Sequence, residues 1–335
     1  MMLLMVELLA MLLVILLAAE LFTNALEHLG ERMNISEGVT GSVFAAVGTA
    51  LPETMVPLIA ILAGTSNAQV NEEIGIGSIL GAPLMLSTLS TCLMALAVFR
   101  QRKAGGRIQP EHTGFVRDLN FFLCAFLIAA LAMFVPVEAK FARFLISALL
   151  VGMYLFYVLL TIRASSELVD DGHGTEAEEP MMLAKLGLKE NVFTLGLQLL
   201  LGLLLLILGA KGFINGVKGL SELLGVSALL ISLLIIPIAT ELPEKVNSIL
   251  WIRRGKDTLA FGNITGAMVF QGTLLPAIGI LLTPWQPRPE VLVGMIVTLV
   301  AAAWLRINAR TQGLAVWALL LNGLLYVAYL VMMLR

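Results

Sequence analysis

Long apolar stretches separated by short polar connectors dominate the pattern of this 335-residue chain. Ten stretches are long enough to cross a bilayer, which takes about 20 apolar residues in a helix. The alternating pattern of a membrane barrel is absent. The predicted fold is therefore an all-α integral membrane protein with ten transmembrane helices. We place these helices at 2–26, 36–64, 72–99, 115–136, 141–163, 191–217, 226–252, 258–282, 289–305 and 313–334.

The composition agrees with lipid as the main solvent of this fold. Hydrophobic residues make up 59% of the chain and charged residues 13%, against about 45–50% and about 25% in soluble domains. A soluble fold cannot cover so much apolar surface with so few charges. The net charge of −2 gives no basic field for nucleic acid. We therefore expect membrane lipid as a partner and no nucleic acid, and no feature specifies an oligomeric state.

The basic residues predict an orientation, because Lys and Arg gather in cytoplasmic connectors. Connectors after the first, third, fifth, seventh and ninth predicted helices hold most of them, for example the run Arg253, Arg254 and Lys256. The connectors and terminus on the other side hold fewer, namely Lys140, Arg143, Lys211, Lys218, Arg288 and Arg335. Both termini are expected outside, and the plasma (inner) membrane is the expected location.

An acidic connector at 164–190 contains the run SSELVDDGHGTEAEEP and divides the chain. Charge runs of this kind are usually solvated and disordered, so a solvated cytoplasmic linker is the expectation, with a regulatory cation site as the alternative. The segments on either side, 1–163 and 191–335, are expected to form two five-helix repeats.

The two halves repeat each other, first at an offset of 191 residues. Identical pairs include Asn24/Asn215, Ser36/Ser227, Thr49/Thr240, Pro52/Pro243 and Glu53/Glu244. Further on, at an offset of 185, the segment 77–82 matches 262–267. Each half holds five predicted crossings, an odd number, so the second copy is inverted in the membrane. Inverted repeats are a known transporter architecture, with the site near the midplane.

Three carboxylates lie midway along predicted helices, where the solvent is lipid. Glu53 ends the segment GTALPE, while Glu241 and Glu244 lie in ATELPEK. Charges at the bilayer centre are costly and mark ion pathways. The prolines free backbone carbonyls, which can serve as oxygen ligands inside a cavity. Thr49 and Thr240 share a helix face with the glutamates four residues later, so these side chains are expected to form one cation site.

The charge of this site favours a divalent cation. Lys245 follows Glu241 by four residues and is expected to pair with it, which leaves a net charge of −2 from the three glutamates. Clustered carboxylates, carbonyls and hydroxyls are the ligands of Ca²⁺, whereas Zn²⁺ and Cu⁺ prefer the His and Cys that are missing here. Inorganic cations are therefore the expected partners, and no resident cofactor is expected.

The third and eighth predicted helices carry glycines at close spacing together with a few polar residues. Gly77, Gly81 and Gly262 allow close helix packing, and a direct role in binding stays open. Gln271 is the polar side chain that we place at the cation site. Two further polar residues, Asn263 and Ser78, are expected to modulate it, as is Lys245.

These motifs resemble those of the sodium/calcium exchanger family of the calcium/cation antiporter superfamily, as in a divergent bacterial-type member. The segments 48–53 and 239–244 resemble the family's GTSLPE signature, within repeat motifs at 48–86 and 239–271. The resemblance implies that Glu53, Glu244, Thr49 and Thr240 bind the transported ions. It also implies a core of helices 2, 3, 7 and 8 with helices 1 and 6 as the gate.

The sequence also departs from the family pattern. Ala50 and Glu241 stand at the signature serines, Ala82 and Ala267 at the serines of the second signature, and Leu86 and Gln271 at its Asn/Asp positions. These hydroxyls and amides supply Na⁺ ligands in the family, so the resemblance leaves Na⁺ coupling and H⁺ coupling both open.

The expected function is therefore a secondary active antiporter that exchanges Ca²⁺ for Na⁺ by alternating access. Exchange of Ca²⁺ or another cation for H⁺ is the alternative, and a non-transporting sensor or a channel is a third. An enzyme is not expected: the sequence has no HExxH motif, and the aspartates, including Asp118 and Asp257, are placed near helix ends or in loops.

Overall fold

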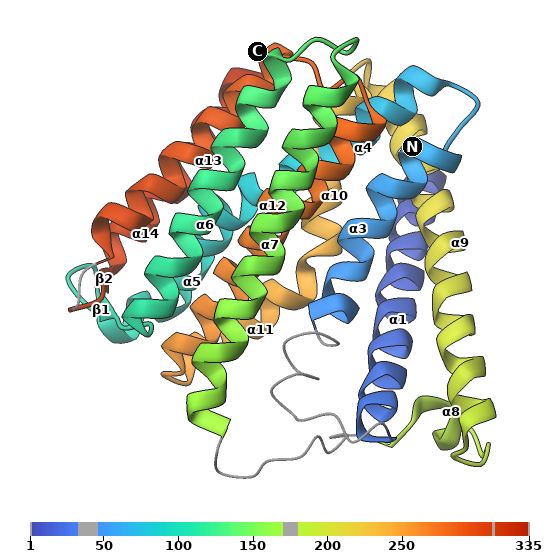
Figure 1. Ribbon diagram of the computed structural model, residues 1–335, viewed down its shortest axis with the longest axis horizontal. Coiled ribbons are helices and arrows are strands. Elements are labelled where there is room, and N and C mark those ends of the chain that lie inside the picture. Colours follow the sequence, from blue (N-terminus) through green and yellow to red (C-terminus); the bar gives the residue numbers. More distant parts are fainter. Residues whose placement is uncertain (1, 33–45, 170–179, 310–311, 334–335) are drawn as a thin grey trace. The chain divides into compact units, whose positions relative to one another are not determined.

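The computed structural model describes residues 2–32, 46–169, 180–309 and 312–333, which fold almost entirely into helices (Figure 1). Within this part of the chain, the only sheet pairs the two-residue strands β1 (Arg107–Ile108) and β2 (Leu314–Ala315) antiparallel. The all-α prediction is confirmed. The helices are α1 (Met2–Arg32), α3 (Ala46–Ala63), α4 (Ala68–Met85), the π-helix η2 (Leu86–Ser90), α5 (Thr91–Arg102), α6 (His112–Leu131), the 3₁₀ turn η3 (Ala132–Phe134), α7 (Lys140–Val169), α8 (Met182–Lys185), α9 (Val192–Leu224), α10 (Ala228–Thr240), α11 (Leu242–Arg253), α12 (Asp257–Leu282), α13 (Pro289–Asn308) and α14 (Val316–Met333).

The chain forms two compact units, and each unit takes segments from both predicted halves. The first unit comprises Met1–Asn71 and Phe156–Gly225, and the second comprises Glu72–Leu155 and Val226–Arg335. The chain passes between the units within α4, within α7 and after α9. The division into two repeats at 164–190 stays a prediction.

In the first unit, α1 and α9 pack antiparallel along their length (Figure 1). Gly202 of α9 lies against Phe22 of α1, and Gly216 lies against Leu8. Together with Gly209, these glycines recur every seven residues, the period of a seam between two coiled helices. A Cβ atom at Gly202 would lie 3.1 Å from the backbone nitrogen of Phe22. The absence of a side chain is therefore what lets these two backbones approach.

The last part of the acidic connector packs against α1 and α9 within the first unit. The Nε2 atom of Gln198 donates a hydrogen bond to Oδ1 of Asn24 at 2.9 Å, and both side chains are buried. The backbone nitrogens of Met182 and Leu183, in α8, donate to Asn24 and Gln198 at 2.9 and 3.0 Å. The expectation of a solvated linker is therefore wrong for this turn, because two buried amides bind its backbone. Residues 170–179 of the acidic run lie outside the described residues.

In the second unit, α4, η2 and α5 form one apolar helix, Ala68–Arg102, which packs against α10. Gly77 lies against the Ser232 side chain, and Gly81 lies against the Leu233 carbonyl, so the two helices run parallel. A Cβ atom at either glycine would overlap α10. The close packing expected from the glycine spacing is present at these two positions.

Arginine contacts hold both ends of α12. Arg102, which ends α5, makes two hydrogen bonds of 2.7 and 2.8 Å with Asp257 at the start of α12. Asp257 also accepts a hydrogen bond from the Gln109 backbone at 2.8 Å. Beyond the other end, Arg143 of α7 donates to the Pro284 carbonyl at 2.8 Å. These contacts place the end of α5 beside the start of α12, and α7 beside the end of α12.

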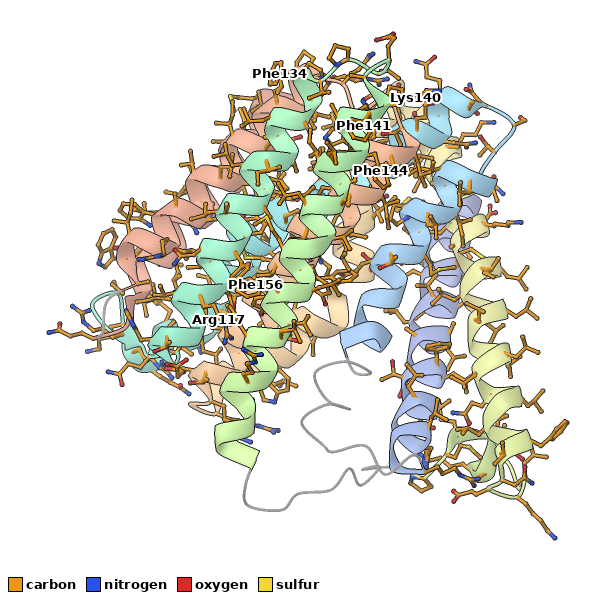
Figure 2. All side chains as sticks on the ribbon, viewed as in Figure 1. Arg117, Phe134, Lys140, Phe141, Phe144 and Phe156 are labelled. Atoms are coloured by element: carbon orange, nitrogen blue, oxygen red, sulfur yellow. The ribbon has the colours of Figure 1, made fainter. Side chains whose placement is uncertain are left out.

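Large apolar side chains cover the outward surface of the helices. Figure 2 labels Phe134, Phe141 and Phe144, whose exposed fractions are 64%, 73% and 56%. In the described residues, eight helices are long and apolar enough to cross a membrane. Two of the ten predicted crossings contain only shorter apolar helices, Glu53–Ala63 and Ala228–Ile238. Part of the first of these predicted crossings, residues 36–45, lies outside the described residues.

Candidate functional site

The predicted crossing at 226–252 is divided into two helices at Glu241. α10 ends at Thr240 and α11 begins at Leu242, while Glu241 itself has φ −97° and ψ 11°. A proline occupies the first turn of α11, where its missing N–H is tolerated, but it cannot extend the hydrogen bonds of α10. The sequence predicted a kink, and the structure shows a break of one residue, Glu241, whose backbone nitrogen still donates to the Pro237 carbonyl at 3.2 Å.

The Glu241 carboxylate is fully buried and is contacted from two sides. The Nε2 atom of Gln271, on α12, donates a hydrogen bond to its Oε1 at 3.1 Å. The Nζ atom of Lys245 lies 3.2 Å from its Oε2. The pairing of Lys245 with Glu241 that the four-residue spacing predicted is therefore present, and Gln271 joins the same cluster.

Lys245 reaches back across the helix break to the end of α10. Its Nζ atom donates a hydrogen bond to the backbone carbonyl of Pro237 at 2.9 Å, and the residue is only 8% exposed. The same carbonyl accepts a hydrogen bond from the Glu241 backbone nitrogen at 3.2 Å. A carboxylate and a carbonyl therefore hold the ammonium, as a buried charge requires.

Three other predicted residues make different contacts. The hydroxyls of Thr240 and Ser78, both buried, donate to the carbonyls four residues earlier in their own helices, at 3.1 and 2.6 Å. Asn263 donates to the Ser248 hydroxyl at 3.0 Å, which joins α12 to α11. Thr240 thus borders the break directly, while the hydrogen bond of Ser78 lies within α4 and that of Asn263 joins two packed helices.

The remaining predicted ligands are described only in part. Glu53 lies in α3 of the first unit and is 5% exposed. The side chains of Thr49 and Glu244 lie outside the described part of the structure. Among the side chains that the structure describes, no three of His, Cys, Asp or Glu gather closely enough to hold a metal ion. The ligand set as a whole therefore stays a prediction.

One buried carboxylate was not expected inside the bundle. Asp118 lies in the second turn of α6, is 5% exposed, and accepts a hydrogen bond from the Thr265 hydroxyl at 2.7 Å. Arg117, labelled in Figure 2, has its Nη2 atom 3.4 Å from the same carboxylate. Asp118 was expected near the end of a helix. α6 begins one turn earlier than predicted, at His112, and Asp118 is buried against α12. The sequence signal for this contact was one polar side chain on each of two apolar segments, Asp118 on α6 and Thr265 on α12.

A family model described as "Sodium/calcium exchanger protein" matches residues 3–163 and 194–335. The chain belongs to the sodium/calcium exchanger family. The two matched stretches cover both predicted repeats and leave out the acidic connector. This exchanger-family protein is therefore an integral membrane protein of an ion antiporter family, whose members are transporters rather than enzymes.

Curated relatives of this exchanger are distant. A protein from Alkalimonas amylolytica named as an antiporter, CaxA, is 26% identical over 80% of this chain and 77% of its own length. The inner membrane protein YrbG of Escherichia coli (strain K12) is 24% identical over 83% of this chain and 79% of its own length. Both alignments extend over most of each protein.

Solved structures share the fold of this exchanger. The crystal structure of the H⁺/Ca²⁺ exchanger CAX has a TM-score of 0.71 at 19% identity and covers 99% of this chain and 82% of that chain. The sodium-calcium exchanger NCX_Mj, soaked without Na⁺ and Ca²⁺, has a TM-score of 0.56 at 20% identity, over 98% of this chain and 99% of that chain.

Proposed function

We propose that this protein is a secondary active antiporter that exchanges Ca²⁺ for Na⁺ by alternating access. The observation that carries the proposal is the fully buried Glu241 carboxylate at a helix break, bound by Gln271, in a chain of the exchanger family. Ionisable groups inside a membrane protein mark ion pathways, and interrupted helices form the cation sites of many transporters.

Carboxylate, hydroxyl and amide oxygens supply the proposed cation site. Its ligands are Glu53, Glu244, Glu241, Thr49, Thr240 and Gln271, with Lys245, Asn263 and Ser78 as modulators. The burial of Glu53 and Glu241 supports these roles, because oxygen-rich sites of this kind suit Ca²⁺. The transported partners are inorganic cations, and no resident cofactor takes part.

Ten crossings in two inverted five-helix repeats form the proposed framework for alternating access. The helices α1 and α9 occupy matching places at the offset of 191, and their antiparallel packing is what two copies of opposite orientation would give. The proposed orientation, with both termini outside the plasma membrane, rests on the distribution of basic residues.

Exchange of Ca²⁺ for H⁺ on the same fold is the second candidate. Ala50, Ala82 and Ala267 lack the hydroxyls that would bind Na⁺ at these positions. An H⁺/Ca²⁺ exchanger is among the solved structures that share this fold, at a TM-score of 0.71. Intramembrane carboxylates also serve as proton carriers in transporters.

Uptake of ⁴⁵Ca²⁺ into proteoliposomes tests the proposal. We expect uptake by the wild-type protein to be driven by an outward Na⁺ gradient and to be lost in Glu53→Gln, because the ion would lose a charged ligand. Glu222→Gln is the matched control, since Glu222 is an exposed carboxylate on α9. Uptake driven only by a H⁺ gradient would select the second candidate.

Three outcomes would contradict an antiporter of either kind. Ca²⁺ uptake that depends on neither gradient and persists in Glu53→Gln would show that the carboxylates do not bind the transported ion. Currents far above the turnover of a carrier would indicate a channel, and Ca²⁺ binding without flux would indicate a sensor.

A further inference from the structure

The Lys245 ammonium occupies a place that a metal cation would suit. Its Nζ atom contacts the Glu241 carboxylate at 3.2 Å and the Pro237 carbonyl at 2.9 Å, and Gln271 binds the other carboxylate oxygen. A carboxylate beside a backbone carbonyl at a helix break is the environment in which transporters hold Na⁺. In this chain, a side chain brings the positive charge to that place.

The charges of Glu241 and Lys245 are both present in the second repeat and both missing from the first. At the offset of 191, Glu241 corresponds to Ala50 and Lys245 corresponds to Thr54, so both members of the pair are missing from the first repeat. The neighbouring Thr240 has an identical counterpart there. The second repeat therefore differs from the first by a carboxylate together with its own cation, and the net charge of the two repeats at these positions is the same.

An ordinary helix-stabilising role accounts poorly for this pair. Pairs of Lys and Glu four residues apart usually lie on a solvated helix face, as Lys218 and Glu222 do, with side chains 29% and 70% exposed and 3.9 Å between charges. The side chains of Lys245 and Glu241 are 9% and 0% exposed. The Lys245 ammonium also crosses the interruption between α10 and α11 instead of lying along one helix.

We propose that Lys245 is a tethered cation that fills one monovalent-cation subsite of the exchanger, formed by the Glu241 carboxylate and the Pro237 carbonyl. This inference rests on the proposed function. A subsite filled by a side chain needs no cation from solution, so the protein exchanges one monovalent cation fewer in each cycle than it would with the subsite free. Lys245 is then a residue that determines ion stoichiometry and specificity.

Removal of the tethered charge tests the subsite directly. The full-length protein is purified as wild type and as Lys245→Met, which keeps the length of the side chain without its charge. Thermal unfolding is followed while Na⁺ replaces N-methylglucamine at constant ionic strength. We expect Lys245→Met to gain a saturable stabilisation by Na⁺ beyond that of the wild type, because an ion that binds only the folded state stabilises it.

Two matched variants show whether the gain belongs to the subsite. The double variant Glu241→Gln/Lys245→Met lacks both charges and is expected to lose the additional Na⁺ effect. Lys218→Met removes the lysine of the exposed pair and is expected to follow the wild-type curve. If Lys245→Met is not recovered in folded form, Lys245→Gln is titrated in its place, since its amide also leaves Glu241 without a positive partner.

The results separate this inference from the proposed function. An unchanged Na⁺ response in the Lys245 variant, or an additional response that persists in the double variant, would overturn the tethered cation. In proteoliposomes, the Hill coefficient for Na⁺ should rise by about one in Lys245→Met. If the proposed function is wrong, Ca²⁺ uptake by the wild-type protein will not be driven by any cation gradient. The unfolding experiment does not depend on transport and would still show whether Na⁺ binds the subsite.

Discussion

The Asp118 carboxylate lies inside an apolar bundle, where the Thr265 hydroxyl and the Arg117 guanidinium contact it. The Thr265 hydroxyl donates to its carboxylate at 2.7 Å, and the same hydroxyl oxygen lies 3.0 Å from the Phe261 carbonyl of its own helix, so the contact joins α6 to α12. Hydrogen bonds to charged groups contribute about 1.5–3 kcal/mol to stability, more than those between neutral groups. This contact therefore fixes the position of the helix that carries Gln271.

Replacement of the hydroxyl at residue 265 should loosen this link. Thr265→Val keeps the shape of the side chain but removes the hydroxyl that donates to the buried Oδ2 atom of Asp118, and we expect the free energy of unfolding to fall by about 1.5–3 kcal/mol. Thr265→Ser retains the hydroxyl and should lose much less. Unfolding of the two variants in detergent measures the difference, and equal losses would contradict the role of the hydrogen bond.

Glu111 caps the first turn of α6. Its carboxylate accepts hydrogen bonds from the backbone nitrogens of Thr113, at 2.7 Å, and Gly114. Burial raises its pKa, but the two backbone hydrogen bonds, the Thr113 hydroxyl and the positive charge of Arg117 together outweigh this effect, so the pKa lies below the ordinary value of 4.5. Because the pKa is lower in the folded protein, the carboxylate stabilises the fold above pH 4.5, and this stabilisation is lost as the pH falls through the folded-state pKa.

The cap predicts a pH-dependent cost for Glu111→Ala. At pH 7 the substitution should lower the free energy of unfolding by about 1 kcal/mol. Below the ordinary pKa of a glutamate, the difference between wild type and variant should shrink, because the wild-type carboxyl becomes protonated. Unfolding measured from pH 7 downwards checks the sign, and a difference that grows as the pH falls would contradict it.

Among the elements, the pair of α1 and α9 depends on the glycine seam between them. Gly202→Ala should push the helices apart, because its Cβ atom would lie 3.1 Å from the Phe22 backbone, and overpacking of this kind costs about 1–3 kcal/mol. The matched control is Gly196→Ala on the same helix, where a Cβ atom meets nothing within 4 Å. That change should leave stability equal or raise it by up to about 1 kcal/mol.

Thermal unfolding and initial rates of Ca²⁺ uptake measure both glycine variants. We expect Gly202→Ala to lower the unfolding temperature and to change the rate, since these helices are the expected gate. If Gly196→Ala had the same effect, helix propensity rather than close approach would be the cause.

The elements that the sequence predicted well are those set by local spacing. The helix ranges follow from long apolar runs, and the Glu241–Lys245 pair follows from a spacing of four residues. The division of the seventh crossing at Glu241 was predicted only as a kink, because a proline alone does not specify how far the helix is interrupted. The Asp118–Thr265 contact was missed because it joins residues that are far apart in the sequence.

For the whole molecule, the division into two units could not be predicted from the repeats. Sequence similarity relates the first half to the second, whereas packing groups α1 and α9 in one unit and α4 with α10 in the other. Contacts between helices depend on which faces meet in three dimensions, and similar apolar faces along the chain do not specify their partners.

The proposed orientation leads to a labelling prediction for the whole molecule. Gly105 and Val137 flank the two ends of α6, whose 20 residues span about 30 Å. In a background with Cys92 and Cys124 replaced by alanine, Val137→Cys should react with a membrane-impermeant maleimide on intact cells. Gly105→Cys should react only after the membrane is opened, and the reverse pattern would contradict the orientation.

The passages of the chain between the two units have a consequence for biosynthesis. The ribosome delivers α4 to α7 before α9 completes the first unit, and the second unit waits for α10 to α14. Arg102 and Arg143 are thus made long before Asp257 and Pro284, which hold them in the finished fold. A nascent chain that stalls before Asp257 carries both arginines without these partners, and this distinguishes an unfinished translation product from a complete one.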